Sequence, residues 1–213
     1  MSPAADEARV KSAEFSAAAA GVGELPPPLS VEVAFAGRSN VGKSSLLNCL
    51  ISRRNLVRVS GTPGCTRKIG FYAAELADGA RVTLVDLPGY GFARRSKSER
   101  DAWAQLIEGY LLGRATLRVV VAIVDVRRGL EPDDRDLLEM VASKPRVSRP
   151  PLTTLVVATK LDKLPLSKQK LELAKVRKAA GLPVLGFSAE TAFGRDELWQ
   201  RIRTAAGIGK SAA

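Results

Sequence analysis

The sequence predicts an α/β protein of the three-layer phosphate-loop class, with helices on both faces of a mostly parallel six-stranded sheet. Short β-branched runs alternate with helical stretches from residue 30 onward, and the glycine-rich loop GRSNVGKS follows the first of those runs. Such alternation is typical of a parallel sheet covered on both faces. Asp78-Gly79 joins two further runs without room for a helix, which predicts a hairpin and therefore one antiparallel strand.

Each element has a local reason. Ser98, followed by acidic residues, begins a helix well, because a hydroxyl and early negative charge satisfy free N–H groups and oppose the helix dipole. Gly181 and then Pro183 end the lysine-rich helix. The expected strands are residues 31–36, 68–76, 81–86, 118–125, 153–159 and 183–188. The expected helices are residues 43–51, 98–112, 133–143, 166–180 and 194–206.

The two ends of the chain lack this pattern. Residues 1–29 are alanine-rich, end in LPPPL and show no clean periodicity, so we expect a flexible N-terminal tail. Residues 30–207 contain no internal repeat and are expected to form one domain. Residues 208–213 are expected to be a disordered end.

Composition narrows the possible chemistry and partners. The chain has 213 residues, no histidine and no run of about 18 apolar residues, so we expect a cytoplasmic, monomeric protein without Ser-His catalysis. The net charge is +11. Such a charge favours polyanionic partners, of which nucleic acid is the commonest. The alternative is a solvated basic surface with no partner.

The loop from Gly37 to Ser44 matches the phosphate-loop pattern in spacing and in context, after a strand and before a helix. Gly37 and Gly42 let backbone N–H groups wrap a phosphate, and the following helix points its positive end there. Lys43 can reach the β- and γ-phosphates, and the Ser44 hydroxyl can bind Mg²⁺. The loop alone predicts a nucleoside triphosphate site.

A second motif, LVDLPGYG, ends an apolar strand at Asp86. This arrangement brings the Asp86 carboxylate near the metal, and the Gly89 N–H can then face a γ-phosphate. An Asp-Leu-Pro-Gly turn is common by itself, but an upstream phosphate loop favours the functional interpretation.

A third motif, Thr159-Lys160-Leu161-Asp162, indicates the base. The carboxylate of Asp162 can accept hydrogen bonds from guanine N1–H and N2 together, whereas adenine offers neither donor. The Lys160 stem can lie on the base, and the backbone of Ser188 and Ala189 can meet guanine O6. GTP or GDP is therefore expected rather than ATP.

Between the first two motifs lies SGTPGCTRK, whose glycines suit a mobile switch. A GTPase needs a threonine there that completes Mg²⁺ coordination when the γ-phosphate is present. Thr62 and Thr66 are both candidates.

These motifs together resemble the EngB (YihA/YsxC) GTPases, relatives of the Era-like GTPases in the superfamily that includes TrmE, EngA and septins. The resemblance rests on GRSNVGKSSLLN, TPGCTR, DLPGYGFA, TKLDKL and FSAE, and it extends over roughly residues 31–206. It implies a GTPase that acts in assembly of the large ribosomal subunit, with a link to cell division and septation. The Cys65-Thr66-Arg67 sequence departs from the usual switch residues but keeps the threonine.

The resemblance also implies the site residues. Thr66, ahead of Thr62, takes the switch role and binds Mg²⁺ directly together with Ser44, while Asp86 acts on the ion through water. The residues with catalytic roles are Asn40, Lys43, Thr66 and Gly89. The expected GTP contacts are Gly37, Arg38, Ser39, Asn40, Val41, Gly42, Lys43, Ser44, Ser45, Gly64, Cys65, Thr66, Arg67, Lys68, Asp86, Leu87, Pro88, Gly89, Thr159, Lys160, Leu161, Asp162, Phe187, Ser188 and Ala189.

The catalytic strategy is unusual because Tyr90 occupies the place where many GTPases carry the glutamine that orients water. We therefore expect slow hydrolysis that K⁺ or a partner accelerates. Several relatives bind K⁺ through an asparagine at the position of Asn40. The alternative is that Asn40 only shapes the loop.

Two functions remain open. The first is a GTP-switched factor that docks on ribosomal RNA or protein, and the second is a switch for a protein partner in division. An enzyme acting on a small-molecule substrate is disfavoured, because no second catalytic constellation is visible. The candidate basic contacts are Arg53, Arg54, Arg58, Arg67, Lys68, Arg94, Arg95, Lys97 and Arg100.

Overall fold

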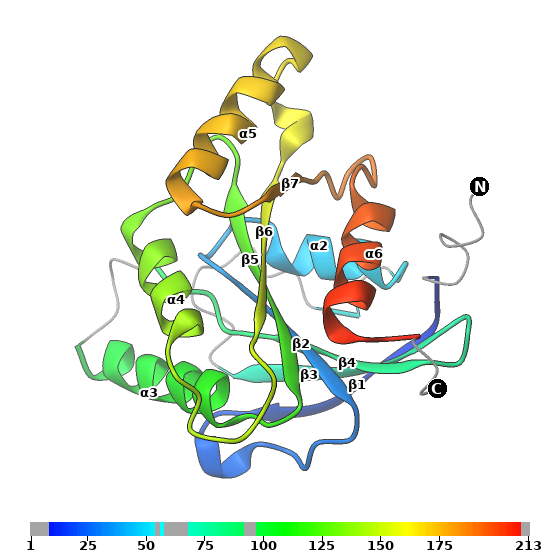
Figure 1. Ribbon diagram of the computed structural model, residues 1–213, viewed down its shortest axis with the longest axis vertical. Coiled ribbons are helices and arrows are strands. Elements are labelled where there is room, and N and C mark those ends of the chain that lie inside the picture. Colours follow the sequence, from blue (N-terminus) through cyan, green and yellow to red (C-terminus); the bar gives the residue numbers. More distant parts are fainter. Residues whose placement is uncertain (1–8, 54–55, 58–67, 92–96, 210–213) are drawn as a thin grey trace.

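The computed structural model describes residues 9–53, 56–57, 68–91 and 97–209 (Figure 1). Its strands are β1 (Val10–Ala19), β2 (Val31–Gly37), β3 (Ile69–Leu76), β4 (Arg81–Asp86), β5 (Leu117–Asp125), β6 (Thr153–Thr159) and β7 (Val184–Gly186). Its helices are α2 (Lys43–Leu50), α3 (Lys97–Gly113), α4 (Pro132–Ala142), α5 (Leu166–Ala180) and α6 (Arg195–Ala206). Two 3-10 turns, η1 (Val22–Glu24) and η2 (Leu161–Lys163), complete the described elements.

The strands form one sheet in the order β1-β3-β4-β2-β5-β6-β7. β3 pairs antiparallel with both β1 and β4, and the other pairs are parallel, so β3 runs against the other described strands. The predicted single antiparallel strand is confirmed, and so is the Asp78-Gly79 hairpin, where Gly79 has a φ of 82°. The predicted number of six strands is wrong, because the described residues form seven.

The seventh strand is β1, which corrects the expectation of a flexible tail over residues 1–29. β1 pairs with β3 from Val10 opposite Leu76 to Ala19 opposite Ile69. Most of its side chains are exposed. An edge strand held mainly by backbone hydrogen bonds needs no apolar periodicity, which is why the sequence pattern did not reveal it.

The C-terminal boundary also needs correction. Ile208 was expected in a disordered end, but it is buried and packs with the hydrophobic cluster that contains α6. Its N–H donates to the Arg203 carbonyl at 3.0 Å, two residues after α6 ends at Ala206. The packed domain therefore extends at least to this residue.

Helices cover the sheet on both sides, as predicted (Figure 1). α2 and α6 pack in one apolar cluster with residues such as Phe35 and Val121. α3, α4 and α5 contribute to a second cluster on the opposite face, with residues such as Val120 and Tyr110. Nothing among the helices of the described residues has the length and apolar character required to cross a bilayer.

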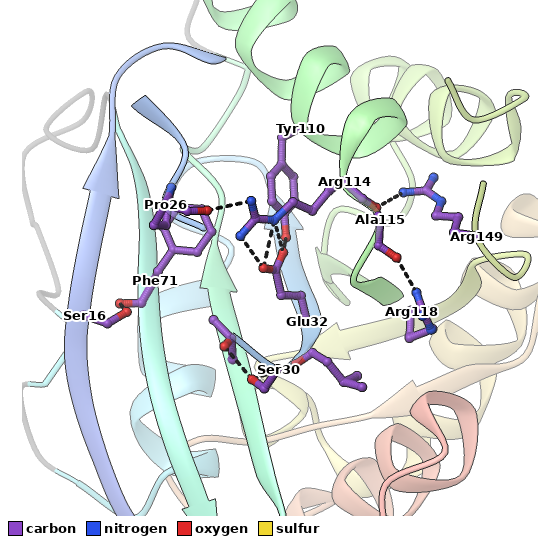
Figure 2. Close-up of polar contacts among 12 residues, drawn as sticks. Ser16, Pro26, Ser30, Glu32, Phe71, Tyr110, Arg114, Ala115, Arg118 and Arg149 are labelled. Atoms are coloured by element: carbon purple, nitrogen blue, oxygen red, sulfur yellow. Dashed lines mark hydrogen bonds and ion pairs between the residues drawn. The ribbon is translucent and has the colours of Figure 1, made fainter. Parts of the chain in front are cut away.

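A buried polar cluster anchors the segment that links β1 to β2 (Figure 2). The Arg114 guanidinium lies against the Glu32 carboxylate at 2.6–2.9 Å, and the Tyr110 hydroxyl donates to Glu32 at 2.9 Å. Arg114 also donates to the Pro26 carbonyl at 2.7 Å. The proline-containing segment is thus bonded to the end of α3. Breaking such a buried pair by removing one partner typically costs about 3–5 kcal/mol.

Candidate nucleotide-binding site

The candidate site lies where the carboxyl ends of the parallel strands meet. Gly37 ends β2, Asp86 ends β4 and Thr159 ends β6, and the strand register places Asp86 opposite Phe35 and Asp125 opposite Thr159. In open parallel sheets, loops at this edge form the ligand-binding crevice. The three motifs that are distant in sequence are therefore neighbours in space.

The phosphate loop joins β2 directly to α2 and contains two left-handed residues. Gly42 has a φ of 95° and Asn40 a φ of 65°. Glycine adopts this conformation without strain, and asparagine tolerates it better than most residues. Asn40 therefore contributes a left-handed backbone conformation to the loop, independently of any ligand that its side chain could bind.

Lys43, at the start of α2, and Asp86, at the end of β4, face each other beside the phosphate loop. The Lys43 ammonium group forms an ion pair with the Asp86 carboxylate, and both side chains are buried. A buried lysine at the first position of a helix requires a negative partner, because burying an unpaired charge is costly. The pair shows that the Asp86 carboxylate points at the phosphate loop.

Gly89 lies against the same loop. The Ser39 N–H donates to the Tyr90 carbonyl at 3.0 Å. A Cβ atom on Gly89 would lie 2.8 Å from the Ser39 hydroxyl oxygen, closer than packed atoms tolerate. The absence of a Cβ atom permits this approach, which brings the Gly89 backbone beside the phosphate loop.

Two side chains of the third motif bind the phosphate loop directly. The Thr159 hydroxyl lies 2.5 Å from the Val41 carbonyl and 3.0 Å from the Val124 carbonyl, and its one proton can donate to either. The Lys160 ammonium group donates to the Asn40 carbonyl at 2.5 Å. The loop that carries the base-recognition residues is thus tied to the loop that would hold the phosphates.

The carboxylate of Asp162 is held by the next loop. The Ser188 hydroxyl donates to Asp162 at 2.7 Å, and this hydrogen bond is the main cause that lowers the pKa of Asp162. The Leu161 N–H donates to the Phe187 carbonyl at 3.1 Å. An ionised carboxylate is an acceptor only, which suits the paired N–H donors of guanine.

Sequence reasoning missed Asp125, which positions Lys160. The Lys160 ammonium group lies 3.0 Å from the Asp125 carboxylate, and Arg127 also donates to that carboxylate at 2.7 and 2.9 Å. Burial raises the pKa of Asp125, but the hydrogen bonds from Arg127 and Lys160 outweigh it and lower the pKa to about 2. A signal existed, because Asp125 ends an apolar run and parallel pairing places it opposite Thr159.

A second missed cluster joins the loops to α4. The Tyr90 hydroxyl donates to the Asp134 carboxylate at 2.8 Å, and the other oxygen of Asp134 accepts the Glu131 N–H at 2.9 Å. Burial is the main cause that raises the pKa of both Tyr90 and Asp134. Arg38 of the phosphate loop forms an ion pair with Glu131. The segment EPDD, which contains Glu131 and Asp134, had no role assigned from the sequence.

The structure brings most predicted residues together, with two qualifications. Five of the predicted residues lie at the site but have buried side chains, so only their backbone can face a ligand. They are Val41, Leu87, Pro88, Leu161 and Phe187. Others lie outside the described residues: Thr62, Gly64, Cys65, Thr66 and Arg67. Lys68 is exposed just before β3.

The candidate basic contacts divide in the same way. Arg53 is exposed, and Lys97 and Arg100 belong to α3. The remaining predicted contacts lie outside the described residues: Arg54, Arg58, Arg94 and Arg95.

The residues present fit a Mg²⁺ ion. Ser44 is the second residue of α2, and Asp86, which ends β4, points its carboxylate at the start of that helix through Lys43. A hydroxyl and a carboxylate are hard oxygen donors of the kind that Mg²⁺ prefers, and Mg²⁺ usually keeps waters and phosphate oxygens as its other ligands. An incomplete protein ligand set is therefore sufficient.

Three features together define a GTPase of the phosphate-loop class. They are a phosphate loop between a strand and a helix, a strand-ending aspartate beside that loop, and a Thr-Lys-x-Asp loop that is bonded to it. The family model described as "50S ribosome-binding GTPase" matches residues 32–160. The chain belongs to the EngB family of GTP-binding proteins, which confirms the resemblance seen in the sequence.

Individual relatives agree with this assignment. The chain is 43% identical to the probable GTP-binding protein EngB of Desulforapulum autotrophicum, over 92% of this chain and 97% of that protein. It is 43% identical to the protein of the same name from Myxococcus xanthus, over 90% of this chain and 93% of that protein. A crystal structure of a probable GTP-binding protein engB matches with a TM-score of 0.63 and 25% identity, covering 83% of this chain and 99% of the other.

Proposed function

We propose that this GTPase is a slowly hydrolysing, cytoplasmic switch that acts in assembly of the large ribosomal subunit, with a link to cell division. GTP binding and GTP hydrolysis follow from the family. The ribosomal role, the slow rate and the roles of individual residues are the parts proposed here.

The roles proposed for the base-recognition residues rest on the bonding between the base loop and the phosphate loop. Thr159 and Lys160 hold the carbonyl groups of Val41 and Asn40. Asp162 follows two residues later, with its carboxylate oriented by Ser188. Guanine bound at Asp162 would therefore be held in a fixed position relative to phosphates bound in the loop.

The proposed roles at the phosphates follow from charge. Lys43 would leave the Asp86 carboxylate for the β- and γ-phosphates, and Asp86 would act on Mg²⁺ through water. Ser44 and Thr66 would bind Mg²⁺ directly, and the Gly89 N–H would face the γ-phosphate. When bound, Mg²⁺ supplies positive charge that offsets the charge on the phosphates. The remaining predicted contacts would act largely through backbone N–H groups.

Slow hydrolysis is proposed from the position of Tyr90. Its hydroxyl is buried and donates to Asp134, so it faces α4 and not the phosphate loop. A side chain held in this way does not orient an attacking water. Asn40 is exposed at the rim of the loop, where its amide oxygen can contribute to a K⁺ site that supplies the missing positive charge.

Two observations support a ribosomal partner. The matching family model is described as a 50S ribosome-binding GTPase. The chain also carries a net charge of +11, which favours contact with a polyanion.

Sedimentation of the full chain with large ribosomal subunits tests the proposal. We expect co-sedimentation in the presence of a non-hydrolysable GTP analogue, weaker co-sedimentation with GDP, and a decrease as salt rises. Crosslinking to assembling particles in the GTP-bound state would then locate the contact. Absence of co-sedimentation in every nucleotide state would reject the ribosomal role and favour a switch for a protein partner in division.

A further inference from the structure

Helix α5 presents a basic face that the nucleotide site does not use. Only Val176 of this helix is fully buried, and α5 projects from the body of the molecule beside β6 and β7 (Figure 1). Two of its leucines are also exposed: Leu166 by 85% and Leu171 by 58%. All of its basic side chains are exposed: Lys168, Lys170, Lys175, Arg177 and Lys178.

These cations are arranged in a row and are short of partners. Lys168, Leu171, Lys175 and Lys178 follow at helical spacings of three and four, so they lie along one side of the helix, over a rise of about 15 Å. Glu172 is the only acidic residue of α5 and pairs with Lys175 at 2.8 Å. The other basic residues of α5 form no ion pair with any carboxylate in the parts of the chain that the structure describes.

The stability of α5 does not explain where all of its basic residues lie. Basic residues in the last turn, such as Lys178, are favoured by the helix dipole. Lys168 lies in the first turn, where the dipole disfavours positive charge, and that turn contains no acidic residue. A cation placed against the dipole and without a carboxylate partner indicates that the face serves a partner with negative charge.

The same helix is bonded to the base-recognition loop. The Gln169 side-chain amide donates to the carbonyl groups of Leu161 and Leu164, at 3.1 Å each. Leu161 is adjacent to Asp162 in the motif that selects the base. A partner held on α5 would therefore contact a helix that is hydrogen-bonded to the base-recognition loop.

We propose that the exposed face of α5 is an RNA-docking surface, in which Lys168, Lys175 and Lys178 contact successive phosphates. This inference rests on the proposed ribosomal role and deepens it, because it assigns the contact to a helix that contains none of the basic contacts expected from the sequence. A regularly charged backbone suits a row of cations in which Lys168 and Lys178 have no carboxylate partner among the described residues and only Lys175 is paired, whereas an acidic protein would more often provide isolated carboxylates.

A charge-reversal experiment on the full chain tests the surface. The test variant is K168E/K178E, and the matched control is R9E/R81E, which changes net charge equally at exposed positions near β1 and β4. In the test variant the two dipole effects oppose each other, because a carboxylate is favourable in the first turn of α5 and unfavourable in the last, so the helix should persist. Circular dichroism and GDP affinity report that the fold and the nucleotide site are intact.

Binding is measured to protein-free large-subunit ribosomal RNA between about 50 and 200 mM salt. We expect the test variant to bind roughly tenfold more weakly, while the control variant binds like the wild type. The slope of the logarithm of the binding constant against the logarithm of the salt concentration should become shallower in the test variant, by an amount that corresponds to about two lost phosphate contacts. Leu171→Ser should leave RNA binding unchanged.

Any one of the following results would overturn the inference. Equal binding by the wild type and the test variant would leave the ribosomal role in place but move the contact elsewhere. Equal weakening by both double variants would show an effect of total charge alone. Efficient competition by poly-glutamate, or strong dependence on Leu171, would identify an acidic or apolar protein surface as the partner. If the wild type bound no ribosomal RNA, contact with RNA would also be rejected as part of the proposed function.

Discussion

The ammonium group of Lys160 lies 3.0 Å from the buried carboxylate of Asp125 and 2.5 Å from the carbonyl of Asn40. The Lys160 ammonium group therefore joins the end of β5 to the phosphate loop. Guanine would stack beside it, on the alkyl stem of Lys160. Asp125 is 2% exposed, so water screens this pair only weakly. Lys160 has a left-handed backbone, with a φ of 61°.

Replacing Asp125 by Asn should weaken nucleotide binding through Lys160. We expect D125N to bind GDP roughly tenfold more weakly, a loss of about 1.4 kcal/mol, because Lys160 loses its charged partner and its fixed orientation. Titration with a fluorescent GDP analogue measures this. Asp196→Asn removes an exposed carboxylate that pairs with Arg195, and it should leave the affinity unchanged. Unaltered affinity in D125N would show that Lys160 needs no such support.

The same carboxylate predicts a pH dependence of stability. Its pKa is about 2 in the folded chain against an ordinary value of 3.8. Because the folded pKa is the lower one, the stabilisation is fully present above the unfolded value and is lost as the pH falls through about 2. It amounts to about 2 kcal/mol at neutral pH. The difference in urea unfolding free energy between wild type and D125N should shrink as the pH is lowered below about 4, and a constant difference would contradict this.

Asp162→Asn should change the base that is preferred. An amide can still accept one guanine donor, but its NH₂ group opposes the guanine N2 amine, whereas it can donate to the oxygen at that position in xanthine. We expect GDP affinity to fall at least about a hundredfold and xanthosine diphosphate affinity to rise. Competition binding with both nucleotides measures the ratio. Glu190→Gln, on an exposed neighbour, should keep the preference for guanine.

A K⁺ role for Asn40 is best tested with glycine. Asn40→Gly removes the amide but keeps the left-handed backbone, whose φ is 65°, whereas Asn40→Ala would also add strain of about 1–2 kcal/mol. We expect single-turnover GTP hydrolysis to be faster in KCl than in NaCl for the wild type and equal in both salts for N40G. If the wild type shows no difference, or N40G keeps it, Asn40 serves only to shape the loop.

The hydroxyl of Tyr90 should matter for stability and not for hydrolysis. Tyr90→Phe leaves one oxygen of the buried Asp134 carboxylate without its donor, which should lower the free energy of unfolding by about 1–3 kcal/mol. The hydrolysis rate under single-turnover conditions should stay within about twofold of the wild type. A large fall in that rate, with bound nucleotide verified, would place the hydroxyl in catalysis.

The sequence by itself determined the class of protein and the base, and it predicted most of the candidate site. Motifs such as Thr159-Lys160-x-Asp162 are local, and parallel strands bring the segments that follow them to one edge of the sheet. Alternating apolar patterns also predicted the described helices and six of the strands. These features depend on short-range spacing, which the order of residues displays directly.

Only the tertiary structure decided what depends on long-range contacts. β1 is held by backbone pairing with β3, which leaves no apolar pattern to read. Asp125 and Asp134 acquire their roles from Lys160 and Tyr90, which lie 35 and 44 positions away. The same applies to Gln169, whose bonds bring α5 against the base loop. The position of Asp125 at the end of an apolar run hints at the site, but the side-chain partners of all three residues are selected by packing after the elements meet.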